Sequence, residues 1–85
     1  MTAIPPSPAE PAHDLEVDAR GLNCPLPILK AKKGLATLAS GQVVKVLATD
    51  VNSERDFQDF ARQTGNTLLH QSREGTLITH WLARR

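Results

Sequence analysis

The chain has 85 residues, of which 40% are hydrophobic and 22% charged, and its formal net charge is +1. This length fits one small domain with a thin core, and a net charge this small does not by itself indicate a nucleic-acid-binding surface. A membrane-spanning helix would need about 20 apolar residues in a row, and neither such a run nor a secretory signal is visible. The only cysteine, Cys24, cannot form an internal disulfide, so we expect a protein of the reducing cytoplasm.

The N-terminal residues 1–13 carry four of the six prolines among small and polar residues. Such a segment buries too little apolar area to offset its ordering entropy. We therefore expect a disordered tail over 1–13 and a single folded domain over 14–85.

Hydrophobic periodicity predicts the first three elements of that domain. Apolar and charged residues alternate over 15–20, which is typical of a half-buried strand. Apolar residues then recur at helical spacing, which predicts a helix from Pro25 to Ser40-Gly41, interrupted by Gly34. Valines over 42–49 predict a second strand.

The second half of the chain predicts a helix and a hairpin. Ser53 is expected to cap the helix, with acidic residues in its first turn, and Gly65-Asn66 to end it. Two strands, 67–73 and 76–83, follow around Glu74-Gly75. We expect His70 and His80 to be cross-strand neighbours, and either Trp81 or the apolar residues on the opposite side of its strand to be partly exposed.

The element order β-α-β-α-β-β predicts an α/β fold of two layers: a mixed four-stranded sheet with two helices on one face. Strand–helix–strand connections are almost always right-handed and parallel. The loops after the first two strands should therefore lie at one edge of the sheet, which brings Cys24 near the turn at 50–53.

Cys24 lies at the predicted turn from strand to helix. The helix dipole favours thiolate there. Pro25 and Pro27 remove two amide donors, so we expect a moderate lowering of the thiol pKa and a rigid turn, and Arg20 and Lys30 could add positive charge. The alternative is a buried cysteine that serves only packing.

The sequence lacks the residues that several other kinds of cysteine chemistry require. A dithiol mechanism needs a second cysteine, and Pro27 occupies the usual place. A cysteine hydrolase needs a nearby base, and nothing in the sequence brings His70 or His80 to Cys24. Zinc needs about four ligands, so we expect no metal site. Chemistry in which the thiol itself carries a sulfur atom remains.

The chain also resembles a known family. The resemblance rests on the run Asp18-Ala19-Arg20-Gly21-Leu22-Asn23-Cys24-Pro25-Leu26-Pro27, which looks like the signature of TusA/SirA-type sulfur carriers. A second family segment is echoed by Asp50, Ser53 and Asp56, although Val51 replaces its proline. The resemblance implies that Cys24 is the catalytic residue, and that the motif residues shape its site: Arg20, Gly21, Pro25, Pro27, Asp50, Ser53 and Asp56.

The same resemblance implies a sulfurtransferase that holds sulfur as a persulfide and needs no other cofactor. The donor would be a cysteine desulfurase or a rhodanese. The acceptor would be a relay protein in tRNA thiolation, cofactor synthesis or sulfur oxidation.

Three lysines follow the motif, and they form either a docking patch for an acidic partner or a solvated helix face: Lys30, Lys32 and Lys33. Two other functions stay open at this point. One is a small RNA-binding or regulatory module, against which the weak net charge and the scarcity of strand aromatics argue. The other is an interaction domain in which the cysteine is structural.

Overall fold

The computed structural model describes residues 10–85, so most of the predicted tail lies outside the described residues, and its boundary stays a prediction. The elements are β1 (Leu15–Ala19), α1 (Leu26–Leu35), β2 (Val43–Ala48), α2 (Ser53–Thr64), β3 (Thr67–Glu74) and β4 (Leu77–Ala83). Neither helix within residues 10–85 combines the length and the hydrophobicity that a membrane span requires.

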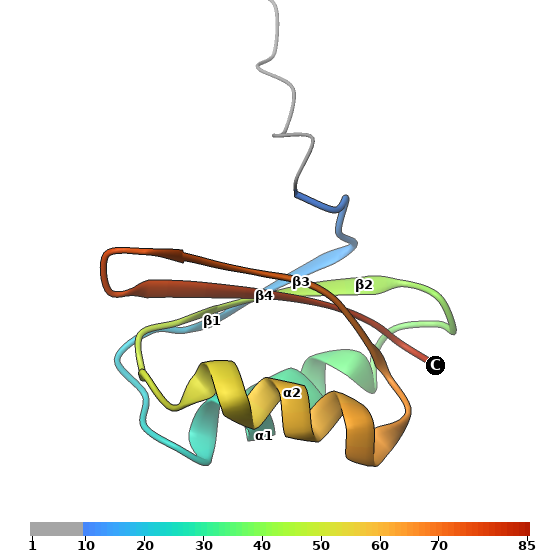
Figure 1. The fold of residues 1–85 in the computed structure, drawn as a ribbon. Helices are drawn as coiled ribbons and strands as arrows, with labels where there is room; N and C mark the ends of the chain where they lie inside the picture. Colours follow the sequence, from blue (N-terminus) through green and yellow to red (C-terminus); the bar gives the residue numbers. More distant parts are fainter. Residues whose placement is uncertain (1–9) are drawn as a thin grey trace, which may run out of the picture.

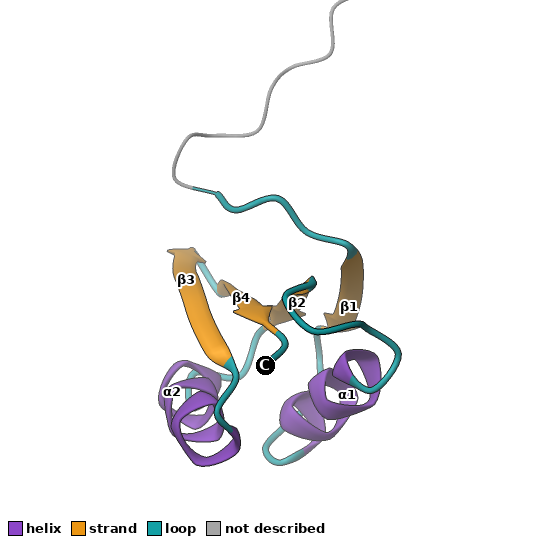
Figure 2. Ribbon diagram, turned by 90° about the vertical axis from the view of Figure 1, so that its right-hand side faces the viewer, coloured by secondary structure: helices purple, strands orange, loops and turns teal. Residues whose placement is uncertain are grey.

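The four strands form one mixed sheet in the order β1-β2-β4-β3. β1 and β2 run parallel, while β4 is antiparallel to both β2 and β3. Both helices cover the same face of the sheet (Figure 1). α1 packs against β1 and β2, and α2 packs against β3 and β4 (Figure 2). The predicted two-layer α/β fold is therefore confirmed.

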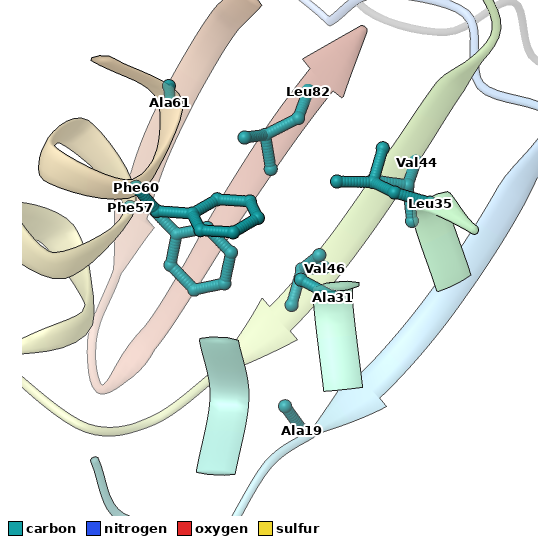
Figure 3. Packing of buried hydrophobic residues seen from close by; sticks show 9 residues of the cluster. All are labelled: Ala19, Ala31, Leu35, Val44, Val46, Phe57, Phe60, Ala61 and Leu82. Carbon is teal, nitrogen blue, oxygen red and sulfur yellow. The ribbon is translucent and has the colours of Figure 1, made fainter. Parts of the chain in front are cut away.

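The core lies between the sheet and the two helices (Figure 3). Alternate residues of each strand face the helices, because successive side chains of a strand point to opposite faces. Phe57 and Phe60 of α2 meet edge to face, with ring centroids 6.3 Å apart. The buried apolar cluster comprises Ala19, Ala31, Leu35, Val44, Val46, Phe57, Phe60, Ala61 and Leu82.

α1 is shorter than predicted, because it ends at Leu35 and not at Ser40-Gly41. After Leu35 the chain turns more tightly: the Thr37 amide donates to the Gly34 carbonyl at 3.0 Å, and the Thr37 hydroxyl donates to the same oxygen at 2.7 Å. Leu38, beyond this turn, still packs against the core.

The N-terminus of α2 also differs from the prediction. Asn52 precedes the helix, no side chain caps it, and Ser53 is its first residue, 1% exposed. The Ser53 hydroxyl lies 3.1 Å from His80 Nε2, so it is engaged with β4 and not with the helix amides. The predicted cap is wrong, whereas the helix does end at Gly65, which has φ +78°.

The hairpin register separates the two histidines that we expected to be neighbours. Glu74 pairs with Leu77, which places His70 opposite Trp81 and Gln71 opposite His80. A β-bulge lies between Leu68 and His70. His80 therefore faces the helices, and His70 lies on the outer face of the sheet.

The expectation that one face of β4 is partly exposed is also wrong. Ile78 and Leu82 are 0% exposed beneath the helices, and Trp81 on the outer face is only 1% exposed. The His70 ring lies 5.1 Å from the Trp81 ring, and Lys45 Nζ lies 5.6 Å from its centroid. The side chains of His70 and Lys45 therefore cover the indole ring of Trp81.

Candidate functional site

Two loops meet at the carboxyl ends of β1 and β2, as the parallel strand order predicts. The Cys24 amide donates to Asp50 Oδ2 at 2.8 Å. The Gly21 amide donates to Thr49 Oγ1 at 2.9 Å, and Gly21 has φ +77°, a conformation that glycine adopts without strain. The first loop, which carries the cysteine, is thus tied to the second at two points.

Asp50 also shapes its own loop. Its Oδ1 accepts a hydrogen bond from the Asn52 amide at 3.1 Å, and its carbonyl accepts one from the Ser53 amide at 3.0 Å. The amides of Asn52 and Cys24 lower the pKa of the Asp50 carboxyl, so this group is charged at neutral pH. The turn closes through Asp50 even though Val51 stands where the family pattern has proline.

Cys24 is exposed, which contradicts the alternative of a buried structural cysteine. The pKa of the Cys24 thiol is raised, chiefly by the hydrogen-bonding influence of the Asp56 carboxylate, and further by desolvation and by the negative charges of Asp56 and Asp50. The expected lowering of the thiol pKa is therefore wrong. The charges of Asp50 and Asp56 disfavour the thiolate, and they outweigh the effect of the α1 dipole, which alone would lower this pKa.

The two prolines hold the start of α1. Pro25 precedes the helix, and Pro27, at its second position, is buried. The Leu26 amide donates to the Asn23 carbonyl at 2.9 Å, so this amide next to Pro25 already has a partner.

The two cations expected near the thiol are both engaged by Asp18. Arg20 Nε and Nη2 donate to the Asp18 carboxylate at 2.9 and 3.0 Å. The Arg20 hydrogen bonds lower the pKa of Asp18 to about 2. Lys30 Nζ donates to the Asp18 carbonyl at 2.9 Å. Arg20 and Lys30 therefore brace the end of β1, and neither forms a hydrogen bond to Cys24.

The three lysines of α1 do not form one patch. Lys30 and Lys33 border a hollow of about 440 Å³ whose apolar lining is Leu22, Leu26 and Leu29. Leu26 and Leu29 are about half exposed, at 47% and 51%. Lys32 instead lines a different cleft, between α1 and α2. The exposed apolar surface beside the cysteine motif was not expected from the sequence, because the helical stripe does not show which leucines lie outside the core.

Neither histidine of the hairpin reaches the thiol. His70 packs on Trp81 at the outer face, and His80 is buried against Ser53 and Gln71. The pairing of His80 with Ser53 was also missed. It joins residues 27 positions apart, and no local pattern marks such a contact.

This chain is similar to known proteins both in sequence and in fold. Residues 15–84 match the family described as Sulfurtransferase TusA. The chain belongs to the TusA family. It is 60% identical over 72 residues to the sulfur carrier protein TusA of Allochromatium vinosum, covering 85% of this chain and 93% of that protein. It is 51% identical over 63 residues to a putative sulfur carrier protein of Neisseria meningitidis, covering 74% and 85%.

A solved structure agrees with this TusA-family assignment. The SirA-like protein of Desulfitobacterium hafniense superposes with a TM-score of 0.73 at 30% identity, covering 82% of this chain and 96% of that one. This TusA-family member is a sulfur carrier, a role that implies partner proteins in a sulfur relay.

Proposed function

We propose that Cys24 is the residue that carries the sulfur, as a persulfide, and that the protein is a sulfurtransferase of the cytoplasm. The observation that carries this proposal is the exposed thiol at the meeting point of the two loops. Around it the described residues supply two carboxylates and no histidine, which suits a carrier better than a hydrolase. Arg20, Gly21, Pro25, Pro27, Asp50, Ser53 and Asp56 shape the site.

The transfer needs no cofactor besides the carried sulfur. The Cys24 thiol loses its proton to solvent, and its sulfur attacks the outer sulfur of a donor persulfide. The donor's S–S bond breaks, its cysteine leaves as thiolate, and Cys24 holds the new S–S bond. An acceptor thiolate then attacks the outer sulfur, and Cys24 leaves as thiolate. A raised thiol pKa is compatible with this step, since thiolate nucleophilicity rises with pKa.

The donor that we propose is a cysteine desulfurase or a rhodanese, and the acceptor is a relay protein. The relay would serve tRNA thiolation, cofactor synthesis or sulfur oxidation. RNA binding by the sheet is less well supported, because such sheets stack bases on exposed aromatics and Trp81, on the outer face, is 1% exposed.

We further propose that partners dock on the hollow beside the motif. Its exposed leucines offer apolar area, and Lys30 and Lys33 at its border offer charge complementary to an acidic rim. Lys32 points to another cleft and is not part of this surface.

Intact mass measured after incubation with a cysteine desulfurase and cysteine tests the carrier residue. We expect a gain of about 32 Da that reductant removes, and no gain in Cys24→Ala. The desulfurase must be shown active on a small thiol in the same mixture. An unmodified protein under those conditions would contradict the proposal.

A further inference from the structure

A buried histidine on β4 is connected to the cysteine loop by three hydrogen-bonded links. His80 Nε2 lies 3.1 Å from Ser53 Oγ. The Ser53 amide donates to the Asp50 carbonyl at 3.0 Å. Asp50 Oδ2 in turn accepts from the Cys24 amide at 2.8 Å. Asp56, which raises the pKa of the Cys24 thiol, lies in the same helical turn as Ser53.

We propose that His80 is a positioning residue for Cys24, acting through Ser53 to hold the first turn of α2, and with it Asp50 and Asp56, against the thiol. The importance of this arrangement for transfer rests on the proposed function. The arrangement itself concerns only how readily the thiol loses its proton.

Gln71 fixes the tautomer of His80. The Gln71 carboxamide donates to the Glu54 carbonyl at 2.9 Å and accepts from Gln58 Nε2 at 3.0 Å. Its other N–H points at His80 Nδ1, 3.0 Å away, so that Nδ1 must accept. The ring hydrogen is therefore on Nε2, and it donates to the Ser53 hydroxyl.

Packing fixes the orientation of the same ring. His80 is 0% exposed and stacks on Phe57 with ring centroids 4.2 Å apart and planes 18° apart. A ring used only to fill space could be replaced by phenylalanine with little effect on the thiol. A ring whose N–H holds Ser53 could not, and this difference makes the proposal testable.

Positioning by His80 should control the pH at which the Cys24 thiol ionises. The ionisable groups facing Cys24 are Asp50 from the second loop and Asp56 from α2. From the β1 and α1 side, Arg20 and Lys30 are engaged by Asp18. If the first turn of α2 loosens, the two carboxylates move from the sulfur and the thiolate is less disfavoured.

The test is the pH–rate profile of Cys24 alkylation by iodoacetamide in the full chain. We expect His80→Phe and Ser53→Ala to move the midpoint to lower pH and to raise the rate at neutral pH by about threefold. Asp56→Asn removes one of the charges directly and should move the midpoint in the same direction. His80→Gln, which keeps a donor near the Nε2 position, should retain the parent profile.

Ile78→Val is the matched control, because it removes a buried methylene from the same face of β4 and leaves both partners of the His80–Ser53 hydrogen bond unchanged. It should leave the profile unchanged. Parent-like profiles in folded His80→Phe and Ser53→Ala, beside a shifted Asp56→Asn, would overturn the proposal; if His80→Phe does not fold, Ser53→Ala decides alone. Alkylation needs no sulfur donor, so this result is independent of whether Cys24 accepts sulfur.

Discussion

At the scale of single residues, Asp50 joins the two loops of the site and also sets part of its charge. One carboxylate oxygen holds the Cys24 amide and the other holds the amide of Asn52. The same carboxylate, with Asp56, raises the pKa of the thiol. The free protein therefore keeps its cysteine mainly as thiol at neutral pH, a form that reacts slowly with electrophiles.

Lys33 and Lys32 are adjacent in the sequence but line different clefts, so they form a matched pair for testing the docking surface. We expect Lys33→Glu to slow sulfur transfer from a donor protein about tenfold, because it reverses a charge beside the exposed leucines. Lys32→Glu should transfer at the parent rate. Both rates are measured by intact mass against time, at low and at high salt, since salt screens the interaction. Equal rates for the two variants would argue that these lysines only solvate α1.

At the scale of elements, Gly34 explains how α1 approaches the edge strand. A Cβ at this position would lie 3.0 Å from Val17 Cγ2 and 3.1 Å from Leu15 Cδ2. The sequence shows this glycine only as a weak point in a helix, with a cost of about 1 kcal/mol relative to alanine. The structure shows that its missing side chain allows the helix to pack closely on β1.

Gly34→Val should therefore destabilise the protein by about 2 to 3 kcal/mol, since it forces a branched side chain into filled space. Lys33→Val places the same residue at an exposed neighbouring position and should cost about 0.5 kcal/mol, from helix propensity alone. Urea unfolding measures both free energies. Similar losses in the two variants would show that propensity, and not packing, governs position 34.

The elements also show which features of the site a sequence can predict. Periodicity and the parallel β1–β2 pair predict that Cys24 and the loop at Asp50 lie at one edge, because these follow from local pattern and topology. The acidity of the thiol depends on Asp56 of α2, which the cysteine motif does not reveal, and the predicted lowering of the thiol pKa is wrong. The prediction that His70 and His80 are cross-strand neighbours failed for a related reason. The exact position of the hairpin turn decides which face of the sheet each side chain takes.

At the scale of the whole molecule, the buried histidine links stability to pH. Burial lowers the pKa of His80 from 6.5 to about 4, and within residues 10–85 no charged side chain is hydrogen-bonded to the ring. The unfolded chain therefore binds a proton at this residue between pH 6.5 and about 4, where the folded chain does not. Stability is fully present above pH 6.5 and declines as pH falls through this window, by about 3 kcal/mol in total.

The carboxyls of Asp18 and Asp50 act in a different range, because their lowered pKa values remove stability only as pH falls below the ordinary value of 3.8. Replacing His80 therefore removes only the pH dependence of stability that falls between pH 6.5 and about 4. We expect the unfolding free energy of the parent to decline between pH 6.5 and 4, and that of His80→Phe to stay flatter by about 3 kcal/mol over the same range. Urea unfolding at a series of pH values gives both curves. Parallel curves would mean that the ring takes up its proton in the folded protein as easily as in the unfolded chain, and that the bond to Ser53 survives protonation.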